Sequence, residues 1–106
     1  MAIVLHSLTR GFARAGHANL RSQLTKAAES ISTNIVEGCG AATNKEFARF
    51  LDMSIKSANE TEHHLLTADA HRLISSEDWQ KYTAETIEIR KMTYVYRKKV
   101  LRSAGQ

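Results

Sequence analysis

Apolar side chains recur in alternating steps of three and four residues along most of this chain, and this spacing constrains the fold more than any other feature. Between Leu20 and Ile35, for example, the steps bring five apolar side chains onto one face of a helix. The 106 residues include no proline and only five glycines, so the composition favours long helices. The sequence therefore predicts an all-α fold.

Start and stop signals divide this spacing into separate helices. Thr43 with Glu46, and Ser75 with Asp78, match the capping-box pattern that begins a helix. Gly38 stands where the end of a helix favours a glycine in the left-handed conformation. The predicted helices cover residues of about 2–9, 19–37, 44–73 and 76–103.

The connections between the last three helices are short, so those helices should run antiparallel to their neighbours. No internal repeat or second domain is visible in the 106 residues. We expect a single domain, 1–106, that folds as an up-and-down antiparallel four-helix bundle with a shortened first helix.

Composition and charge narrow the functional classes. One cysteine, Cys39, cannot form an internal disulfide, and no apolar run is long enough for a membrane span. A cytoplasmic protein without membrane contact is therefore expected. The formal charge of +4 permits a nucleic-acid partner and does not require one.

Several large apolar side chains fall outside the predicted helix seams. They are Phe50, Ile55, Ile87, Met92, Tyr94, Val95 and Leu101. A bundle of three and a half helices has too little interior to bury all of them. Because large exposed apolar patches usually mark association, we expect a homo-oligomer.

Polar side chains form a stripe beside the core stripe of the second predicted helix. Ser30, Asn34 and Glu37 share one face, and Glu37 lies at the helix end, where a carboxylate is disfavoured. The next helix begins alongside this end and could offer Glu37 its free N–H groups, or the cations Lys45 and Arg49. We predict a structural polar network between the two helices, which Ser57 and Glu60 would extend. A ligand or ion site is the alternative.

A basic stripe runs along the last predicted helix. Six cations follow Glu88, and no acid does. The residues predicted to bind nucleic-acid phosphates are Arg90, Lys91, Arg97, Lys98 and Arg102. The alternative is that these cations only complement the negative end of the helix dipole.

Three histidines, His63, His64 and His71, raise the question of a metal site. Glu60 and His63 form one E-x-x-H motif, whereas a di-metal carboxylate bundle needs two such motifs and two further glutamates. We therefore expect no metal and no cofactor. No arrangement of a nucleophile with a base is visible, so we predict no catalytic residue and no enzyme activity.

The second and third predicted helices resemble a known family. S-I-x-x-N-I-x-E-G over 30–38 and N-K-E-F over 44–47 are similar to motifs of the four-helix-bundle proteins related to the 23S rRNA intervening-sequence protein. The resemblance extends over roughly residues 20–100 and departs at the first helix, which is longer in most members. More distantly, the chain resembles the accessory protein of diversity-generating retroelements.

The resemblance implies an up-and-down four-helix bundle and, from the accessory proteins, a pentameric ring with a basic surface. Those accessory proteins bind nucleic acid and a reverse transcriptase. Together with the basic stripe, the resemblance predicts a non-catalytic oligomeric protein that binds RNA, or DNA, through its basic face. The alternative is a scaffold or accessory subunit, for example of a reverse transcriptase, that binds a protein partner through exposed apolar helix faces.

Overall fold

The computed structural model describes residues 1–104 as four α-helices and one short 3₁₀ helix, with no strand in that range. The elements are α1 (Ala2–Leu8), η1 (Arg10–Phe12), α2 (Ala18–Cys39), α3 (Asn44–Ala70) and α4 (Ser76–Ala104). Each α-helix begins and ends within three residues of its predicted limits, so the all-α prediction is confirmed. None of these helices is long and apolar enough to cross a membrane.

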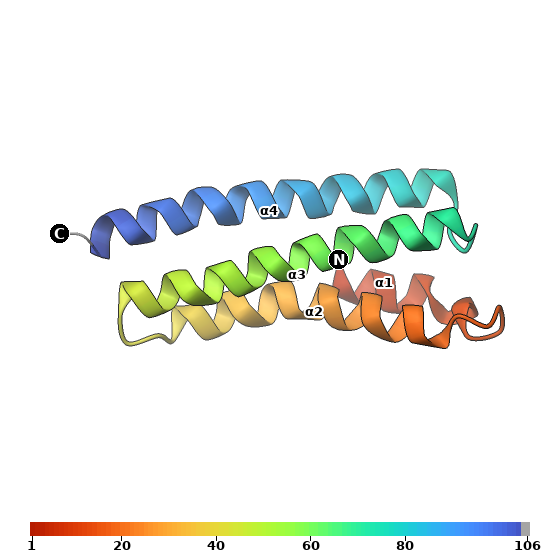
Figure 1. Ribbon diagram of the computed structural model, residues 1–106, viewed down its shortest axis with the longest axis horizontal. Helices are drawn as coiled ribbons and strands as arrows, with labels where there is room; N and C mark the ends of the chain where they lie inside the picture. The colour runs from red at the N-terminus through yellow and green to blue at the C-terminus, as the bar shows by residue number, and fades with distance from the viewer. Residues whose placement is uncertain (105–106) are drawn as a thin grey trace.

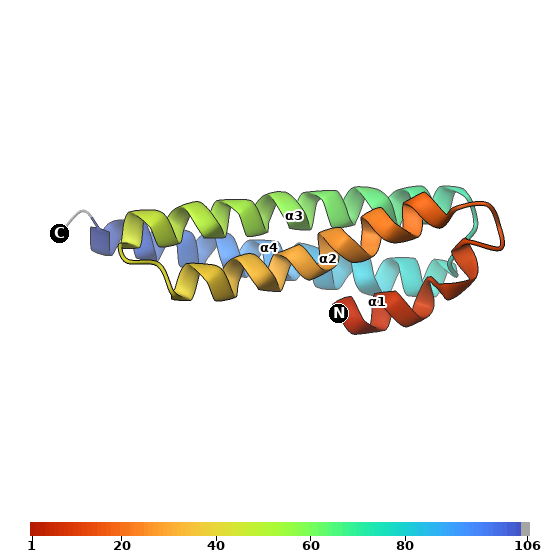
Figure 2. The ribbon, with the colours of Figure 1, turned by 90° about the horizontal axis from the view of Figure 1, so that it is seen from below.

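Three long helices lie side by side in an elongated bundle of 52 × 21 × 16 Å, with α3 in the middle (Figure 1). α3 packs against α2 on one side and α4 on the other, whereas the backbones of α2 and α4 do not approach each other. α1 packs against α2 and runs beside only its N-terminal half (Figure 2). The predicted up-and-down bundle with a shortened first helix is confirmed.

Side-chain caps begin the two helices for which the sequence predicted them. Thr43 Oγ1 accepts a hydrogen bond from the Glu46 amide at 3.1 Å, and Ser75 Oγ accepts one from the Asp78 amide at 3.0 Å. Each bond satisfies an N–H group that has no partner inside its helix. These two starts could therefore be predicted from local sequence alone.

The predicted left-handed cap at Gly38 is wrong. Gly38 lies inside α2 and is buried, and the helix continues to Cys39 before it is capped at Gly40 with φ −90°. A Cβ atom built on Gly38 would lie 2.7 Å from a ring carbon of Phe47 and 3.1 Å from Cβ of Phe50. The glycine is therefore needed for the close approach of α2 to α3, not for a change of backbone direction.

The core consists of a larger and a smaller cluster of buried side chains. The larger cluster joins all four helices through buried residues that include Leu5, Phe12, Leu24, Leu65 and Tyr82. The smaller cluster contains Ala48, Leu51 and Val100, with Ile35 and Phe47 partly buried against it. We call residues 1–28 and 58–88 the capped half, because this half contains α1 and the larger cluster that α1 joins. Residues 29–57 and 89–104 are the open half.

Arg21 of α2 holds α1 in place. Its guanidinium donates hydrogen bonds to Thr9 Oγ1 at 3.2 Å and to the His6 carbonyl at 3.0 Å, and it lies 3.1 Å from His6 Nδ1. A helix of seven residues is too short to persist alone in water. α1 therefore depends on these bonds and on the burial of Leu5.

Candidate nucleic-acid interface

Charge is divided unevenly between the two halves of the bundle. The open half carries nine lysines and arginines against four aspartates and glutamates, and the capped half carries six against seven. The formal charges are therefore +5 and −1, which together give the +4 of the chain. A polyanion would be attracted to the open half.

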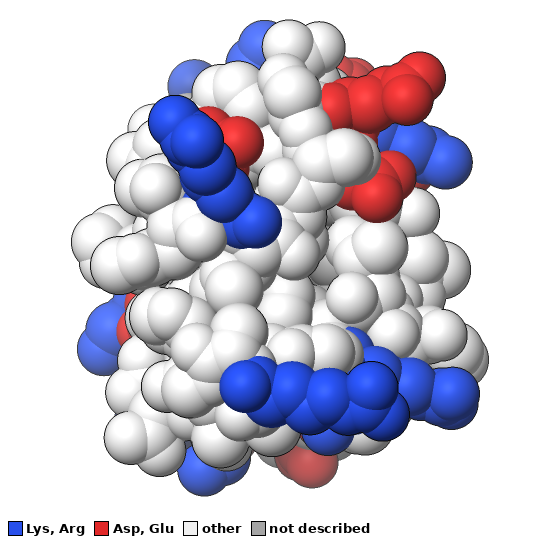
Figure 3. All heavy atoms as spheres, turned by 90° about the vertical axis from the view of Figure 1, so that its right-hand side faces the viewer, with Lys and Arg blue, Asp and Glu red and all other residues white. Residues whose placement is uncertain are grey.

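The end of the capped half carries charges of both signs. Figure 3 views this end of the bundle, where basic and acidic side chains are interspersed around an uncharged centre. Interspersed charges of both signs produce little net field at a distance.

Among the described helices, the second half of α4 brings its backbone close to α3 alone. It packs on α3 through the buried residues Thr93 and Val100. Its other sides face solvent and expose five large apolar side chains by 36% or more: Met92, Tyr94, Val95, Tyr96 and Leu101. Of the large apolar side chains that fall outside the predicted helix seams, Phe50, Ile55 and Ile87 are partly buried.

Two of the five predicted phosphate-binding residues already pair with acids of α3. Arg90 Nη1 lies 2.5 Å from Glu62 Oε1 and 3.0 Å from Asn59 Oδ1. Arg97 Nε pairs with Asp52 Oδ1. A phosphate that approached either arginine would compete with a carboxylate already paired with it.

The other three predicted residues, Lys91, Lys98 and Arg102, are exposed and form no ion pair with any described residue. Lys98 Nζ lies 4.9 Å from the centre of the Tyr94 ring, a cation–π distance. Tyr94 is 48% exposed, so a cation and an aromatic face lie together on the surface. This combination suits single-stranded nucleic acid, which offers both phosphates and stacked bases.

α3 adds cations that the sequence analysis did not assign to nucleic-acid binding. Lys45 and Arg49 lie seven and three residues before Asp52, and Lys56 lies four after it, so the four side chains share one face of α3. Because Asp52 pairs with Arg97, this face adjoins α4. The helical spacing was visible in the sequence, but only the ion pair places this face beside the basic stripe.

We use the term basic face for the three exposed cations of the predicted stripe, which point about 100–140° around α4 from Arg97, together with three exposed cations of α3. It consists of Lys45, Arg49, Lys56, Lys91, Lys98 and Arg102. Their role in nucleic-acid binding stays a prediction.

The structural polar network predicted between α2 and α3 does not form as expected. Glu37 and Glu60 are exposed, and Asn34 Nδ2 donates to the Ser30 carbonyl of its own helix at 2.8 Å. Ser57 is buried, yet across residues 1–104 no hydrogen bond joins these five residues from one helix to the other. Their contribution to stability or assembly stays a prediction.

A different residue links the two helices. Ser54 Oγ of α3 donates to the Ile31 carbonyl of α2 at 2.9 Å, in a buried position. Ala27 of α2 and Ala58 of α3 are also buried, so small side chains bring the two backbones close enough for a hydroxyl to reach a carbonyl. Spacing along one helix does not reveal this partner on another.

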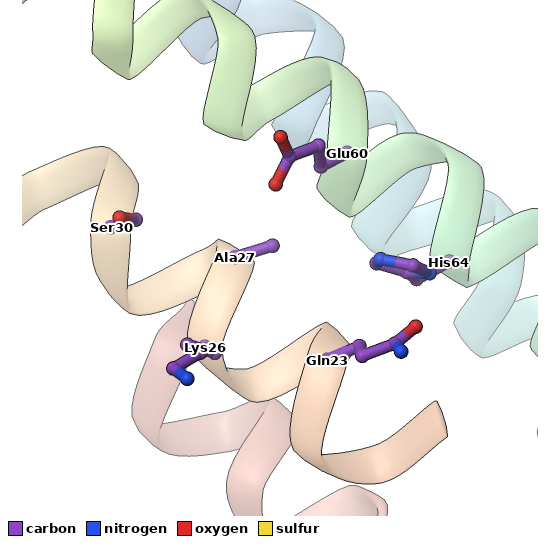
Figure 4. A pocket seen from close by; sticks show the side chains of 6 residues that line it. All are labelled: Gln23, Lys26, Ala27, Ser30, Glu60 and His64. Atoms are coloured by element: carbon purple, nitrogen blue, oxygen red, sulfur yellow. The ribbon is translucent and has the colours of Figure 1, made fainter. Parts of the chain in front are cut away.

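A polar hollow of about 410 Å³ lies between α2 and α3 near the middle of the bundle. Glu60 and His64 extend into it from α3, opposite Gln23, Lys26 and Ser30 of α2 (Figure 4). Burial lowers the pKa of His64 below its ordinary value of 6.5, and His63 lowers it further, against the raising effect of Glu60. No group of three or more potential metal ligands occurs among the described residues.

Known proteins similar to this chain support the fold. A family profile described as 23S rRNA-intervening sequence protein matches residues 1–95. A crystal structure of a protein with unknown function from the S23 ribosomal protein family of Bacteroides thetaiotaomicron VPI-5482 superposes with a TM-score of 0.85. The two sequences are 24% identical, and the match covers 92% of this chain and 88% of that one. No curated protein matches the chain.

Proposed function

This chain belongs to the 23S rRNA-intervening sequence protein family, and on that premise we propose that it is a non-catalytic protein that binds RNA through its basic face. The concentration of cations on the open half carries the proposal, with nine basic residues against four acidic ones. Lysines and arginines that meet phosphates release bound counterions, which favours association. We choose RNA over DNA because the family is described by a ribosomal RNA.

The salt dependence of binding tests this proposal. Fluorescence anisotropy of a labelled mixed-sequence RNA, titrated with the protein between 50 and 300 mM salt (about a sixfold range), yields the slope of log K against log salt. The variant Lys91→Gln/Lys98→Gln/Arg102→Gln removes three exposed cations of the basic face. Its slope should be smaller by about 2, because each phosphate contact on a single strand contributes about 0.7.

A matched variant on the capped half controls for net charge. Arg10→Gln/Arg14→Gln/Lys26→Gln removes three exposed cations as well. It should leave most of the affinity intact. Equal losses in the two variants would reduce binding to net charge and refute a basic face, and undetectable binding by the wild-type protein would refute RNA binding altogether.

Assembly with copies of itself is the second part of the proposal, and the family resemblance suggests five copies. We place the contact on the capped half, where charge nearly balances, since two open halves of +5 repel each other. This half exposes Ile3 by 87%, Val4 by 44% and Leu66 by 53%. Ile3→Asp should lower the oligomer mass in light scattering; a monomeric wild-type protein would refute assembly.

Protein binding is the second candidate function, as a scaffold or as an accessory subunit of an enzyme such as a reverse transcriptase. The apolar side chains exposed on α4 favour it. Apolar docking depends weakly on salt, whereas phosphate binding falls steeply with ionic strength, so the same titration separates the two functions.

A further inference from the structure

Arg21, which holds α1 in place, also lines a hollow of about 270 Å³ where α1 and the first half of α2 run side by side (Figure 2). The residues that line it are His6, Ala13, Ala18, Arg21, Ser22 and Thr25. No carboxylate is among them, and residues 1–28 of the chain carry four cations and no acid. The charge at this hollow is therefore positive.

The guanidinium of Arg21 is already fixed at the hollow before any ligand arrives. Its Nε and Nη2 atoms are bonded to Thr9 and His6, whereas Nη1 forms no hydrogen bond with any of residues 1–104. Nη1 therefore has two N–H groups free for a ligand. Because the side chain is immobilised in advance, binding a ligand costs it little further conformational entropy.

The contact between Arg21 and His6 decides which imidazole nitrogen carries the proton. A guanidinium only donates, so His6 Nδ1, at 3.1 Å from Arg21 Nη2, accepts. The neutral ring therefore has its proton on Nε2, which is a donor.

The two hydroxyl groups of the lining differ in what they have left to offer. Thr25 Oγ1 donates to carbonyls of its own helix, at 2.9 Å to Arg21 and 3.2 Å to Ser22. The hydroxyl of Ser22 forms no hydrogen bond with any of residues 1–104 and is exposed. The hollow thus combines one permanent cation with N–H and O–H donors, and this combination recognises an oxyanion.

A phosphate group matches these donors better than a carboxylate does. A carboxylate pairs best with two neighbouring nitrogens of an arginine, and Nε and Nη2 of Arg21 are already in use. A phosphate monoester has three acceptor oxygens and up to two charges, so it can meet donors from several residues at once. Glu29, the first acid of the chain, borders a neighbouring hollow instead.

We propose that the hollow formed by His6, Arg21 and Ser22 binds a phosphate group, either inorganic phosphate or the terminal phosphate of a larger molecule. Phosphate bound there links α1 to α2, because His6 belongs to α1 and the other two residues belong to α2. It adds to the hydrogen bonds through which Arg21 holds α1. The inference does not depend on the proposed RNA binding, since the basic face and this hollow share no residue.

Nuclear magnetic resonance tests the site with inorganic phosphate as the probe. Phosphate is titrated into the full chain at constant pH and ionic strength, with chloride as the balancing anion. Amide shifts in residues 6–25 should saturate with a dissociation constant on the order of 1 mM, and those in residues 44–57 should not change. At about ten times that concentration, hydrogen exchange in residues 2–8 should slow about tenfold, because phosphate binds only while α1 is docked.

Single variants locate the donors. Ser22→Ala and His6→Ala should each weaken phosphate binding about tenfold, which is the effect of losing one hydrogen bond to a charged group. Both variants keep the Arg21 bonds to Thr9 and to the backbone carbonyl of residue 6, so α1 stays attached. Ser32→Ala removes an exposed hydroxyl elsewhere on α2 and should leave binding within about twofold.

A second arm identifies the source of the phosphate. The mixed-sequence RNA, labelled at its 3′ end, is compared with and without a 5′ phosphate. At least about threefold tighter binding of the phosphorylated RNA, abolished by Ser22→Ala, would assign the site to an RNA terminus. Equal affinities, with saturable binding of inorganic phosphate, would assign it to free phosphate or a small phosphorylated molecule.

Three outcomes would overturn the inference. Shifts that grow without saturation would mean an adventitious ion only, and so would folded Ser22→Ala and His6→Ala variants that bind phosphate as the wild type does. Thermal melting confirms the fold of each variant. The variant Lys91→Gln/Lys98→Gln/Arg102→Gln should retain phosphate binding, and a loss there would move the anion site to the basic face.

Discussion

The capped and open halves are built from the same three long helices, yet only the capped half has a deep core. There, a helix of seven residues and a 3₁₀ turn complete the larger cluster with Leu5 and Phe12, which are 0% and 2% exposed. In the open half α2, α3 and α4 enclose a small cluster and leave Val36 and Met92 in solvent. We therefore expect the capped half to be the more stable part, while the open half keeps more large apolar and more basic side chains exposed.

The largest expected difference between the halves comes from removing one buried leucine from each. Leu65 and Leu51 lie on α3 and are 0% and 1% exposed. Leu65→Ala should lower the free energy of unfolding by about 4 kcal/mol and Leu51→Ala by about 2.5 kcal/mol, because the thinner cluster relaxes more readily around a cavity. Urea unfolding measures both values. Equal losses would show that the two clusters are equally well packed.

A smaller effect tests the close approach of α2 and α3 in the open half. Gly38→Ala should lower the free energy of unfolding by about 1–2 kcal/mol, since its Cβ would crowd Phe47 and Phe50 by more than the helix gains from alanine. Gly40→Ala is the matched control, because its Cβ would meet only the Glu37 carbonyl at an ordinary 3.6 Å. If both variants melt at the wild-type temperature, the contact is looser than the structure indicates.

The attachment of α1 should respond to loss of Arg21. Arg21→Met removes the hydrogen bonds to Thr9 and His6 and should cost about 1 kcal/mol, discounted for the partly exposed position. Hydrogen exchange should accelerate in residues 2–8 and stay unchanged in 44–57, which α1 does not cover. Equal acceleration in both segments would mean that the two halves unfold as one unit.

The smallest effect is a pH dependence confined to the capped half, which contains all five histidines. Burial lowers the pKa of His64, so the unfolded chain takes up its proton first as the pH falls through 6.5. Stability should therefore decline below that pH, with His63 reinforcing the loss and Glu60 opposing it. In His64→Gln the fall in melting temperature between about pH 7 and pH 5 should be smaller; an identical fall would exclude His64 as a contributor.

Local sequence was sufficient to predict each helix and most of its limits. Thr43 and Ser75 cap the helices that their spacing to Glu46 and Asp78 predicted. Gly38 was misread because a glycine near a helix end most often adopts the left-handed conformation, and its actual role depends on Phe47 in another helix. The residue spacing within α2 cannot reveal a contact that Gly38 makes with α3.

The candidate site shows the same division. The basic stripe of α4 was visible as an acid-free run after Glu88. Its pairing with α3 through Arg90 and Arg97, and the cations that α3 contributes, were not. The stripe alone therefore did not reveal that two of its arginines are ion-paired, or that α3 contributes three further exposed cations.

By itself, the sequence determined four helices, their antiparallel order and a basic C-terminal helix, because periodicity and caps act over a few residues. Only the tertiary structure decided that α3 lies in the middle, that α1 packs on the N-terminal half of α2, and that the apolar and basic surfaces of α4 are exposed. The physical reason is that periodicity defines the faces of a helix, whereas the neighbour that covers each face is chosen by packing between segments distant in the chain.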